Sequence, residues 1–233
     1  PDTCDLMCAK MLDLTLDRGV NGPAAGVIVE PLQASAGMIP CPQRYLQRVR
    51  EICDRHDVPL IFDEIQTYIR IGAFFAAEHY GVTPDIIALG KAVGGGLPLG
   101  ATLIRDGLAG FEPDAEELHT FAANTLSMVG AIRLIEIVQR DRLLEHANRM
   151  GEHLRQGLAG LQSDFPEIGD IRQTGLHIGV ELVEDPETKK PLNEQTLCPA
   201  EGPRGHYVLL VDKTDPLNFT QKYAFVSVLR ELV

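Results

Sequence analysis

Asp85-Ile86-Ile87-Ala88-Leu89-Gly90-Lys91 is an apolar run that ends in a glycine and a lysine, and three further glycines follow at Gly94–Gly96. Four consecutive apolar residues between an aspartate and a glycine are typical of a short strand that is buried on both faces. A lysine at the exit of such a strand is unusual, because an ammonium group loses hydration there unless it is paired, neutralised or used covalently. Desolvation favours the neutral, nucleophilic form of an amine. The sequence therefore predicts a strand over Asp85–Gly90 and a reactive amine at Lys91.

A second apolar run, Leu60-Ile61-Phe62-Asp63-Glu64, ends in carboxylates and predicts a strand over Pro59–Asp63. The segment between the two runs, Glu64–Pro84, is long enough for the crossover that parallel neighbours require. Asp63 and Lys91 then both fall at the carboxyl ends of strands in one sheet, the edge at which open α/β sheets bind ligands. We expect the acid and the amine to face one cleft.

The chemistry of this pair is specific. An amine that can hold an aldehyde and an acid that can charge-pair a ring nitrogen are the two halves of a pyridoxal 5'-phosphate site. Gln66, about one turn beyond Asp63, is placed to hydrogen-bond the phenolic oxygen of that ring. The plainer alternatives are a helix N-cap for Asp63 and a surface amide for Gln66. The run that ends at Asp63 also imitates the metal-binding strand of a P-loop ATPase, but the chain lacks the GxxxxGK[ST] motif.

Strand and helix patterns alternate along the rest of the chain, which predicts the α/β class with a mostly parallel sheet flanked by helices. The expected helices cover Cys4–Arg18, Gln43–His56, Ala73–Tyr80 and Ser127–Leu161, the last with a break near Gly151. The other expected strands cover Ala24–Glu30, Leu99–Arg105 and short segments between Ile168 and Glu184, whereas Pro31–Pro42 resembles a loop.

Composition excludes several other classes of protein. The 233 residues carry a formal net charge of −12, which argues against nucleic acid or an anionic membrane as a partner. The five cysteines include no CxxC pair, and the histidines lack HxxxH and HExxH spacing, so we expect reduced thiols and no metal site. No apolar run reaches the ~18 residues of a membrane span, and no signal peptide is recognisable. The expected location is the cytoplasm, and a chain without an initiator methionine is expected to be a fragment.

Several blocks in a fixed order resemble the class III aminotransferases, a family that includes ornithine, acetylornithine and 4-aminobutyrate aminotransferases and dialkylglycine decarboxylase. The blocks are Val29–Gln33 (VEPLQ), Phe62–Thr67 (FDEIQT), Gly81–Asp85 (GVTPD), Gly90–Ala92 (GKA) and Gly96–Gly100 (GLPLG). The resemblance implies a fold-type-I pyridoxal-phosphate enzyme. It implies a partial large domain over residues 1–145 and the start of a small α+β C-terminal domain over 146–195. Residues 196–233 stay unassigned.

The resemblance also implies roles for individual residues. Lys91 is implied to be the Schiff-base lysine, Asp63 the partner of the pyridine nitrogen and Gln66 a contact of the ring oxygen. Thr120, in the block Thr120–Asn124 (TFAAN), matches a threonine that contacts the cofactor phosphate from a neighbouring subunit. The implied protein is a homodimer with shared sites, which transfers an amino group between an amine or amino acid and a 2-oxo acid.

Three departures from the family pattern leave alternatives open. Ser35 stands where aminotransferases of ω-amino substrates often carry an acid, which is closer to a decarboxylating transaminase of the dialkylglycine type. The loop Tyr68–Gly72 is one residue shorter and bulkier than the usual G-x-G-R-T-G. The Gly-rich phosphate loop and the carboxylate-binding arginine of the family are not recognisable. A truncated, catalytically impaired module is therefore the other alternative, and we expect the chain alone to bind the cofactor weakly.

Overall fold

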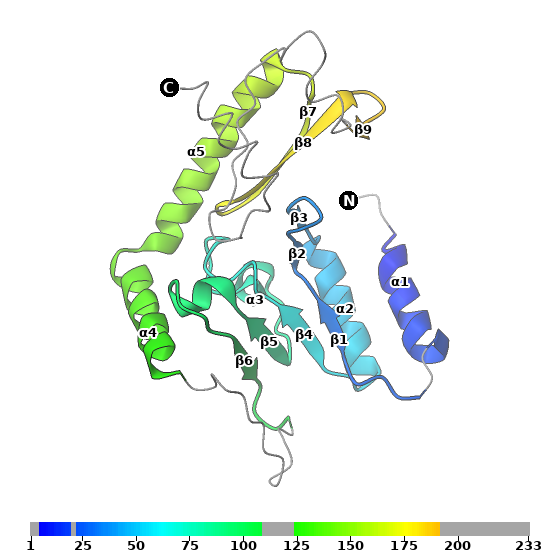
Figure 1. Cartoon of the computed structure of the whole chain (residues 1–233). Coiled ribbons are helices and arrows are strands. Elements are labelled where there is room, and N and C mark those ends of the chain that lie inside the picture. Colours follow the sequence, from blue (N-terminus) through cyan, green and yellow to red (C-terminus); the bar gives the residue numbers. More distant parts are fainter. Residues whose placement is uncertain (1–4, 20–21, 109–123, 192–233) are drawn as a thin grey trace.

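The computed structural model describes residues 5–19, 22–108 and 124–191 (Figure 1). A four-stranded sheet with helices beside it forms the lower part of the molecule in this view, and a long helix with a β-hairpin forms the upper part. Thr120 and the unassigned segment 196–233 lie outside the described residues. In those described ranges, no helix combines the length and the apolar composition needed to cross a membrane.

The sheet has the strand order β1-β4-β5-β6. Its members are β1 (Val27–Val29), β4 (Leu60–Asp63), β5 (Ile86–Leu89) and β6 (Ala101–Ile104). The first three strands are parallel, which confirms the α/β class with a mostly parallel sheet. β6 runs antiparallel to β5. The connection between β5 and β6 is too short for the crossover of a dozen or more residues that a parallel strand needs.

Helix α2 (Gln43–Arg55) covers one face of the sheet and confirms the helical spacing. Its apolar stripe is fully buried, and Leu46, Val49 and Cys53 of the stripe pack in one core cluster with sheet residues that include Leu60 and Phe62. The members of the stripe are Leu46, Val49, Ile52 and Cys53. Burying each such side chain contributes about 1.5–3 kcal/mol, so this stripe anchors the sheet that carries Asp63.

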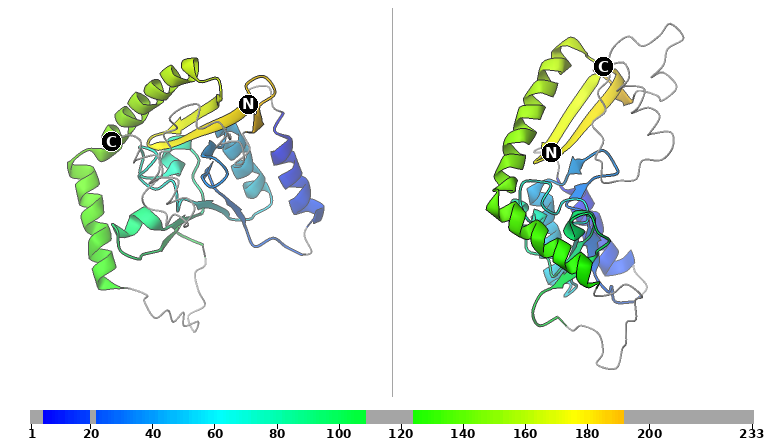
Figure 2. Two further views of the ribbon diagram at one scale, coloured as in Figure 1. Left: turned by 45° about the horizontal axis from the view of Figure 1, so that its top comes forward. Right: turned by 60° about the vertical axis from the view of Figure 1, so that its left-hand side comes forward.

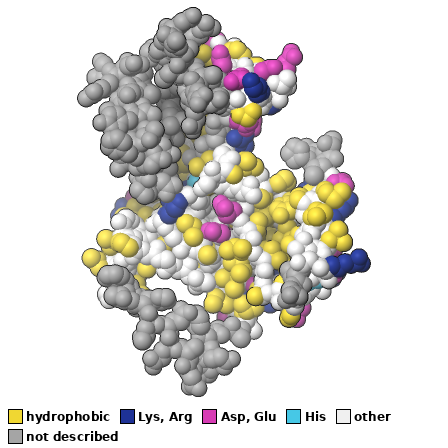
Figure 3. All heavy atoms as spheres, turned by 45° about the vertical axis from the view of Figure 1, so that its right-hand side comes forward, with side chains coloured by type: hydrophobic (Ala, Val, Ile, Leu, Met, Phe, Trp, Pro, Cys, Tyr) yellow, Lys and Arg dark blue, Asp and Glu magenta, His cyan; other side chains and the backbone are white. Residues whose placement is uncertain are grey.

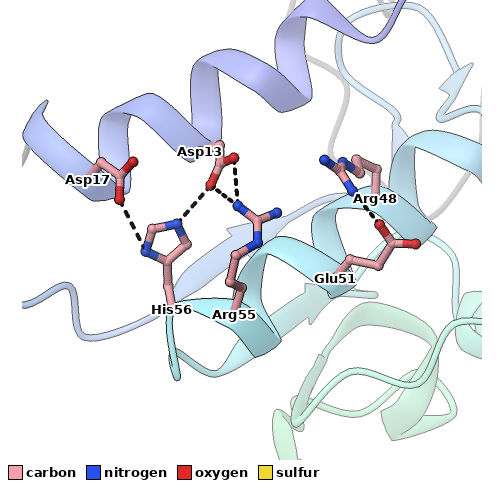
Figure 4. A network of polar contacts seen from close by, with 6 residues as sticks. All are labelled: Asp13, Asp17, Arg48, Glu51, Arg55 and His56. Atoms are coloured by element: carbon pink, nitrogen blue, oxygen red, sulfur yellow. Dashed lines mark hydrogen bonds and ion pairs between the residues drawn. The ribbon is translucent and has the colours of Figure 1, made fainter.

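Helix α1 (Met7–Leu14) continues into a π-helical turn, η1 (Thr15–Gly19), and α1 lies against α2. A polar network joins the two helices (Figure 4). The Asp13 carboxylate accepts hydrogen bonds from Arg55 Nη1 at 2.6 and 2.7 Å and lies 2.8 Å from His56 Nε2. The hydrogen bonds from Arg55 and then from His56 hold the pKa of Asp13 below its usual value. The network fixes α1 against α2. Neither Asp63 nor Lys91 belongs to these two helices.

The segment predicted as a loop after β1 contains a small hairpin of β2 (Leu32–Gln33) and β3 (Ile39–Pro40). Helix α3 (Ala76–Tyr80) starts three residues later than predicted, because the residues before it form turns. A short 3-10 helix, η2 (Lys91–Gly94), follows β5.

The upper part of the molecule in Figure 1 is built from α5 (Leu143–Asp164) and a three-stranded sheet of β7 (Ile168–Thr174), β8 (His177–Asp185) and β9 (Lys190–Pro191). Helix α4 (Thr125–Arg140), which precedes α5, lies lower, beside the four-stranded sheet. Helix α5 runs alongside the β7–β8 hairpin in all three views (Figure 2). The predicted break near Gly151 is wrong, because the helices separate at Arg142, which has a left-handed backbone with φ of 51°.

Gly151 is a packing glycine in the middle of α5. A Cβ at this position would lie 1.8 Å from the carbonyl oxygen of Gly175, in the β7–β8 turn. Gly157, on the same helix, has nothing within 4 Å of such a Cβ. The glycine that the sequence pattern assigns to a helix break is therefore required by the close approach of the hairpin.

These two glycines give a matched pair of predictions. Gly151→Ala is expected to lower the free energy of unfolding by about 1–3 kcal/mol, since the new methyl group must displace backbone. Gly157→Ala is expected to raise it by about 0.5–1 kcal/mol, because alanine loses less backbone entropy in a helix. Urea unfolding of both variants checks this, and a Gly151→Ala variant as stable as Gly157→Ala would contradict the packing.

Candidate active site

The sheet brings Asp63 and Lys91 to one edge. Asp63 is the last residue of β4 and is paired in register with Ala88 of β5, and the Glu64 N–H donates to the Ala88 carbonyl at 2.9 Å. Lys91 opens η2 just after β5 and Gly90. Neighbouring strands lie about 4.8 Å apart, so the acid and the amine leave adjacent parallel strands at the same carboxyl-terminal edge.

Lys91 has an unusual backbone. Its φ is 45°, in the left-handed region, which costs a non-glycine residue about 1–2 kcal/mol. Its side chain is exposed. The desolvated surroundings that the sequence predicts for this amine are not found in the described part of the chain, because the strand ends one residue earlier and the turn carries Lys91 out to the sheet edge.

Asp63 is half-buried, and its Oδ1 accepts the Ile65 N–H at 3.0 Å. This bond closes a local turn directly after the strand. Asp63 is not the N-cap of α3, which is Phe75; the carboxylate that receives N–H groups at the start of α3 is that of its neighbour Glu64. The turn fixes the Asp63 carboxyl group at the edge of the sheet without placing it at a helix terminus.

Glu64 is fully buried and organises the loop that follows β4. Its carboxylate accepts hydrogen bonds from Thr67 Oγ1 at 3.0 Å and from the N–H groups of Ala76 and Ala77, at 2.5 and 3.1 Å, at the start of α3. Burial raises the pKa of Glu64. Sequence reasoning missed this residue, because a carboxylate that accepts from an N–H group 12 residues further along the chain leaves no local signal.

Gln66 lies in the same loop, and its side chain is oriented by Arg70. Arg70 Nη1 donates to Gln66 Oε1 at 2.9 Å. A guanidinium group can only donate, so the amide oxygen must face Arg70 and the amide nitrogen must point elsewhere. The loop thereby decides which end of the Gln66 amide acts as the donor.

The bulky loop Tyr68–Gly72 packs an aromatic ring against residues on either side of Lys91 in sequence. Tyr68 is only 3% exposed, and its ring lies 6.4 Å from that of Phe74 and 5.7 Å from that of Phe75. It shares a core cluster with Leu89 and Val93, which flank Lys91 in sequence. Burial raises the pKa of the Tyr68 phenol. The shorter loop is therefore filled by an aromatic side chain that supports the turn of Lys91.

His177 is a second residue for which the sequence predicts no more than a structural role. It is the first residue of β8, and its Nε2 lies 2.7 Å from the backbone oxygen of Gln66. The two residues are 111 positions apart. Only the packing of the hairpin against the sheet edge brings them together.

Comparison with known proteins gives a consistent result. The sequence model described as Aminotransferase class-III matches residues 3–227, and it extends over most of the segment beyond residue 195 that the motifs leave unassigned. The diaminobutyrate–2-oxoglutarate aminotransferase of Rhizobium meliloti (strain 1021) is 42% identical over 170 residues, which are 72% of this chain and 36% of that protein. The leucine/methionine racemase of Thermococcus litoralis is 35% identical over 191 residues, 81% of this chain and 43% of the racemase.

A solved structure of similar shape is an amine transaminase from an uncultivated Pseudomonas species in its PLP-bound form. The TM-score is 0.75 at 31% identity, and the match covers 81% of this chain and 45% of that structure. This chain therefore spans less than half the length of these three proteins.

Proposed function

The chain belongs to the class III aminotransferase family, and from this premise we propose that it carries the catalytic edge of a pyridoxal-phosphate-dependent aminotransferase. The observation that supports the proposal most directly is the position of Asp63 and Lys91 at the carboxyl ends of adjacent parallel strands. The proposed reaction moves an amino group between an amine or amino acid and a 2-oxo acid.

The donor set at this edge fits the cofactor. An aldehyde requires an amine, a pyridine nitrogen requires an acid and a phenolic oxygen requires a donor, and the chain offers Lys91, Asp63 and the oriented amide of Gln66. When bound, pyridoxal phosphate supplies a carbonyl carbon that accepts and returns amino groups and a ring that takes up electron density. Thr120 stays our candidate for a phosphate contact.

In this proposal Lys91 has two tasks. Its Nζ would hold the cofactor covalently, and as a free amine the same Nζ would accept and return the proton of the substrate carbon. The left-handed turn at Lys91 and the exposure of its side chain support both tasks, since the amine needs room to move between them.

Asp63 and Gln66 hold the ring in the proposal. The Asp63 carboxylate keeps a proton on the ring nitrogen, which makes the ring a better acceptor of electron density. The Gln66 amide nitrogen donates to the ring oxygen, because Arg70 occupies the amide oxygen. The loop that carries both residues is held by the buried carboxylate of Glu64.

The proposed substrates are defined by class only. The matched relatives have names that refer to different amino compounds, such as diaminobutyrate, leucine and methionine, so the family does not select one donor. Ser35 supports a second candidate, a decarboxylating transaminase. It lies between β2 and β3, at the position where ω-amino-acid aminotransferases often carry an acid.

A spectroscopic titration tests the proposed function. We expect the full-length protein to develop visible absorbance with pyridoxal phosphate, and an amino donor followed by a 2-oxo acid to remove and restore that absorbance. Carbon dioxide release from an α,α-disubstituted amino acid identifies the decarboxylating alternative. A protein that binds the cofactor but transfers no amino group from a broad panel of donors is the impaired module, and one that shows no absorbance change contradicts the proposal.

We also propose a homodimer with shared sites. Helix α4 exposes apolar side chains at Leu126, Val129 and Ile132, spaced three residues apart along one stripe. Thr120, the candidate for the phosphate contact between subunits, precedes α4 by a few residues in sequence. Further exposed apolar side chains gather on the face that carries α1 and β1 (Figure 3), with Met7, Met11, Leu14 and Ile28 among them.

The dimer prediction concerns one side chain of α4. Ile132→Glu is expected to convert the protein to monomers in sedimentation velocity and to reduce amino transfer at least about tenfold, because a charge in an apolar interface is costly when desolvated. Gln139→Glu adds the same charge at an exposed polar position of the same helix and serves as the control. An active, cofactor-bound monomer would rule the shared site out.

A cytoplasmic location is part of the proposal. The described cysteines Cys8, Cys41 and Cys53 are free thiols, as is usual in a reducing compartment.

A further inference from the structure

We propose that His177 is a positioning residue of the active site, which holds Gln66 in place from the β8 strand. The inference rests on the proposed function, because Gln66 matters for catalysis only if it contacts the cofactor. It adds a residue of the β7–β8 hairpin, which acts on the site through the backbone carbonyl of Gln66.

The contact between His177 and Gln66 has one chemically sensible form. A carbonyl oxygen only accepts, so the His177 Nε2 that lies 2.7 Å from the Gln66 oxygen must carry the hydrogen. The other ring nitrogen, Nδ1, lies 3.0 Å from the thioether sulfur of Met38. His177 is 5% exposed, so the loop after β4 and the β2–β3 hairpin loop meet on the two sides of one buried ring.

The β7–β8 turn and helix α5 also bind the loop from Gln66 to Gly72. The Leu176 N–H donates to the Arg70 oxygen at 2.9 Å, and Asn148 Nδ2 donates to the Gly72 oxygen at 3.0 Å. A Cβ at Gly175 would lie 2.2 Å from the Ile71 carbonyl carbon. The loop from Gln66 to Gly72 is thus held at three carbonyl oxygens by donors from α5 and the hairpin.

Of these three holds, the one from His177 acts directly on the residue of the proposed site. Gln66 is three residues beyond Asp63, and its side chain also accepts a hydrogen bond from Arg70. The Arg70 carbonyl in turn accepts the hydrogen bond from the Leu176 N–H. A shift of the Gln66 backbone therefore moves the amide donor itself. Misplacing a catalytic group by about 1 Å can cost on the order of 10²-fold in rate. The position of the β7–β8 hairpin consequently affects the geometry of the sheet edge that carries Asp63 and Lys91.

Two substitutions separate the hydrogen bond from the shape of the ring. His177→Gln can place an amide N–H where Nε2 stands, whereas His177→Leu fills similar space without a donor. His153→Leu, at an exposed position of α5, is the matched control. Three quantities are measured in the full-length protein: amide hydrogen exchange over residues 66–72 in the cofactor-free state, the affinity for pyridoxal phosphate, and kcat and KM of amino transfer.

We expect His177→Leu to accelerate exchange over 66–72 by about tenfold, because one buried hydrogen bond to the loop is lost, and to lower cofactor affinity and kcat by about tenfold or more. His177→Gln is expected to stay within about threefold of the wild type in all three, as is His153→Leu. Unchanged exchange or unchanged cofactor affinity in His177→Leu overturns the inference, and so does a His177→Gln variant as impaired as His177→Leu. A wild-type protein that binds no cofactor overturns the proposed function instead, and the exchange data still report whether His177 holds the loop.

Discussion

Lys91→Ala is expected to lower the rate of amino-group transfer by at least about 10³-fold, the largest effect of any substitution in this chain. The side chain is proposed to act both as the covalent anchor of the cofactor and as the base for the substrate proton, and loss of a positioned base alone typically costs 10²–10⁴-fold. The fold should survive, because Lys91 is exposed and lies at the edge of the sheet, outside the buried core.

The measurement has two parts. Borohydride treatment of the wild-type holoprotein, followed by peptide mapping, should place a pyridoxyl group on Lys91, and the transfer rate of the variant should recover in part with a small added amine. Lys190→Ala is the control, since Lys190 is an exposed lysine of β9 that pairs with Glu184 of β8. A pyridoxyl group on another lysine, or a Lys91→Ala rate within tenfold of the wild type, would sink the assignment.

Asp63→Asn is expected to slow the transfer step by at least about 10²-fold while leaving cofactor binding detectable. The substitution removes the charge that is proposed to keep the ring nitrogen protonated, and a misdirected or missing electrostatic partner typically costs 10²–10³-fold. The shape of the turn should be kept, because an asparagine oxygen can still accept the Ile65 N–H.

Single-turnover absorbance on addition of an amino donor measures this step directly. Asp57→Asn is a matched control. Asp57 precedes the same strand at its opposite end, is exposed, and has a left-handed backbone with φ of 52° that asparagine tolerates. A near-wild-type rate for Asp63→Asn would mean that another group protonates the ring, whereas an equal loss in Asp57→Asn would point to a general effect on stability.

Much of the local structure could be predicted from the sequence. The runs that end at Asp63 and at Gly90 are apolar throughout, and the structure has β4 and β5 at these places. The spacing of Leu46, Val49 and Ile52 predicts the buried stripe of α2. Such patterns are readable because burial repeats with the period of the element itself. That Asp63 and Lys91 lie at the same edge of the sheet follows from the length of the connection between the two strands, Glu64–Pro84, which is long enough for parallel neighbours.

Where the sequence failed, a distant partner was decisive. Gly151 is typical of a helix break, yet it lies inside α5 because the carbonyl of Gly175 packs against it. Two other features depend on a local connection and not on a distant partner: the exposure of Lys91 depends on where η2 begins, and the antiparallel direction of β6 on the connection that precedes it. The role of Thr120 stays a prediction, as do the domain boundaries at residues 145 and 195.

The sequence by itself determined the class of the fold, the family and the acid–amine pair at the sheet edge, because these depend on short periodic patterns and on blocks of residues that stay together along the chain. Only the tertiary structure decided that the Glu64 carboxylate binds the start of α3, that Tyr68 packs with Leu89 and Val93 and that His177 holds the Gln66 carbonyl. The physical reason is that a hydrogen bond across 111 residues is selected by the packing of a hairpin against a sheet edge, and no local periodicity encodes which donor arrives there.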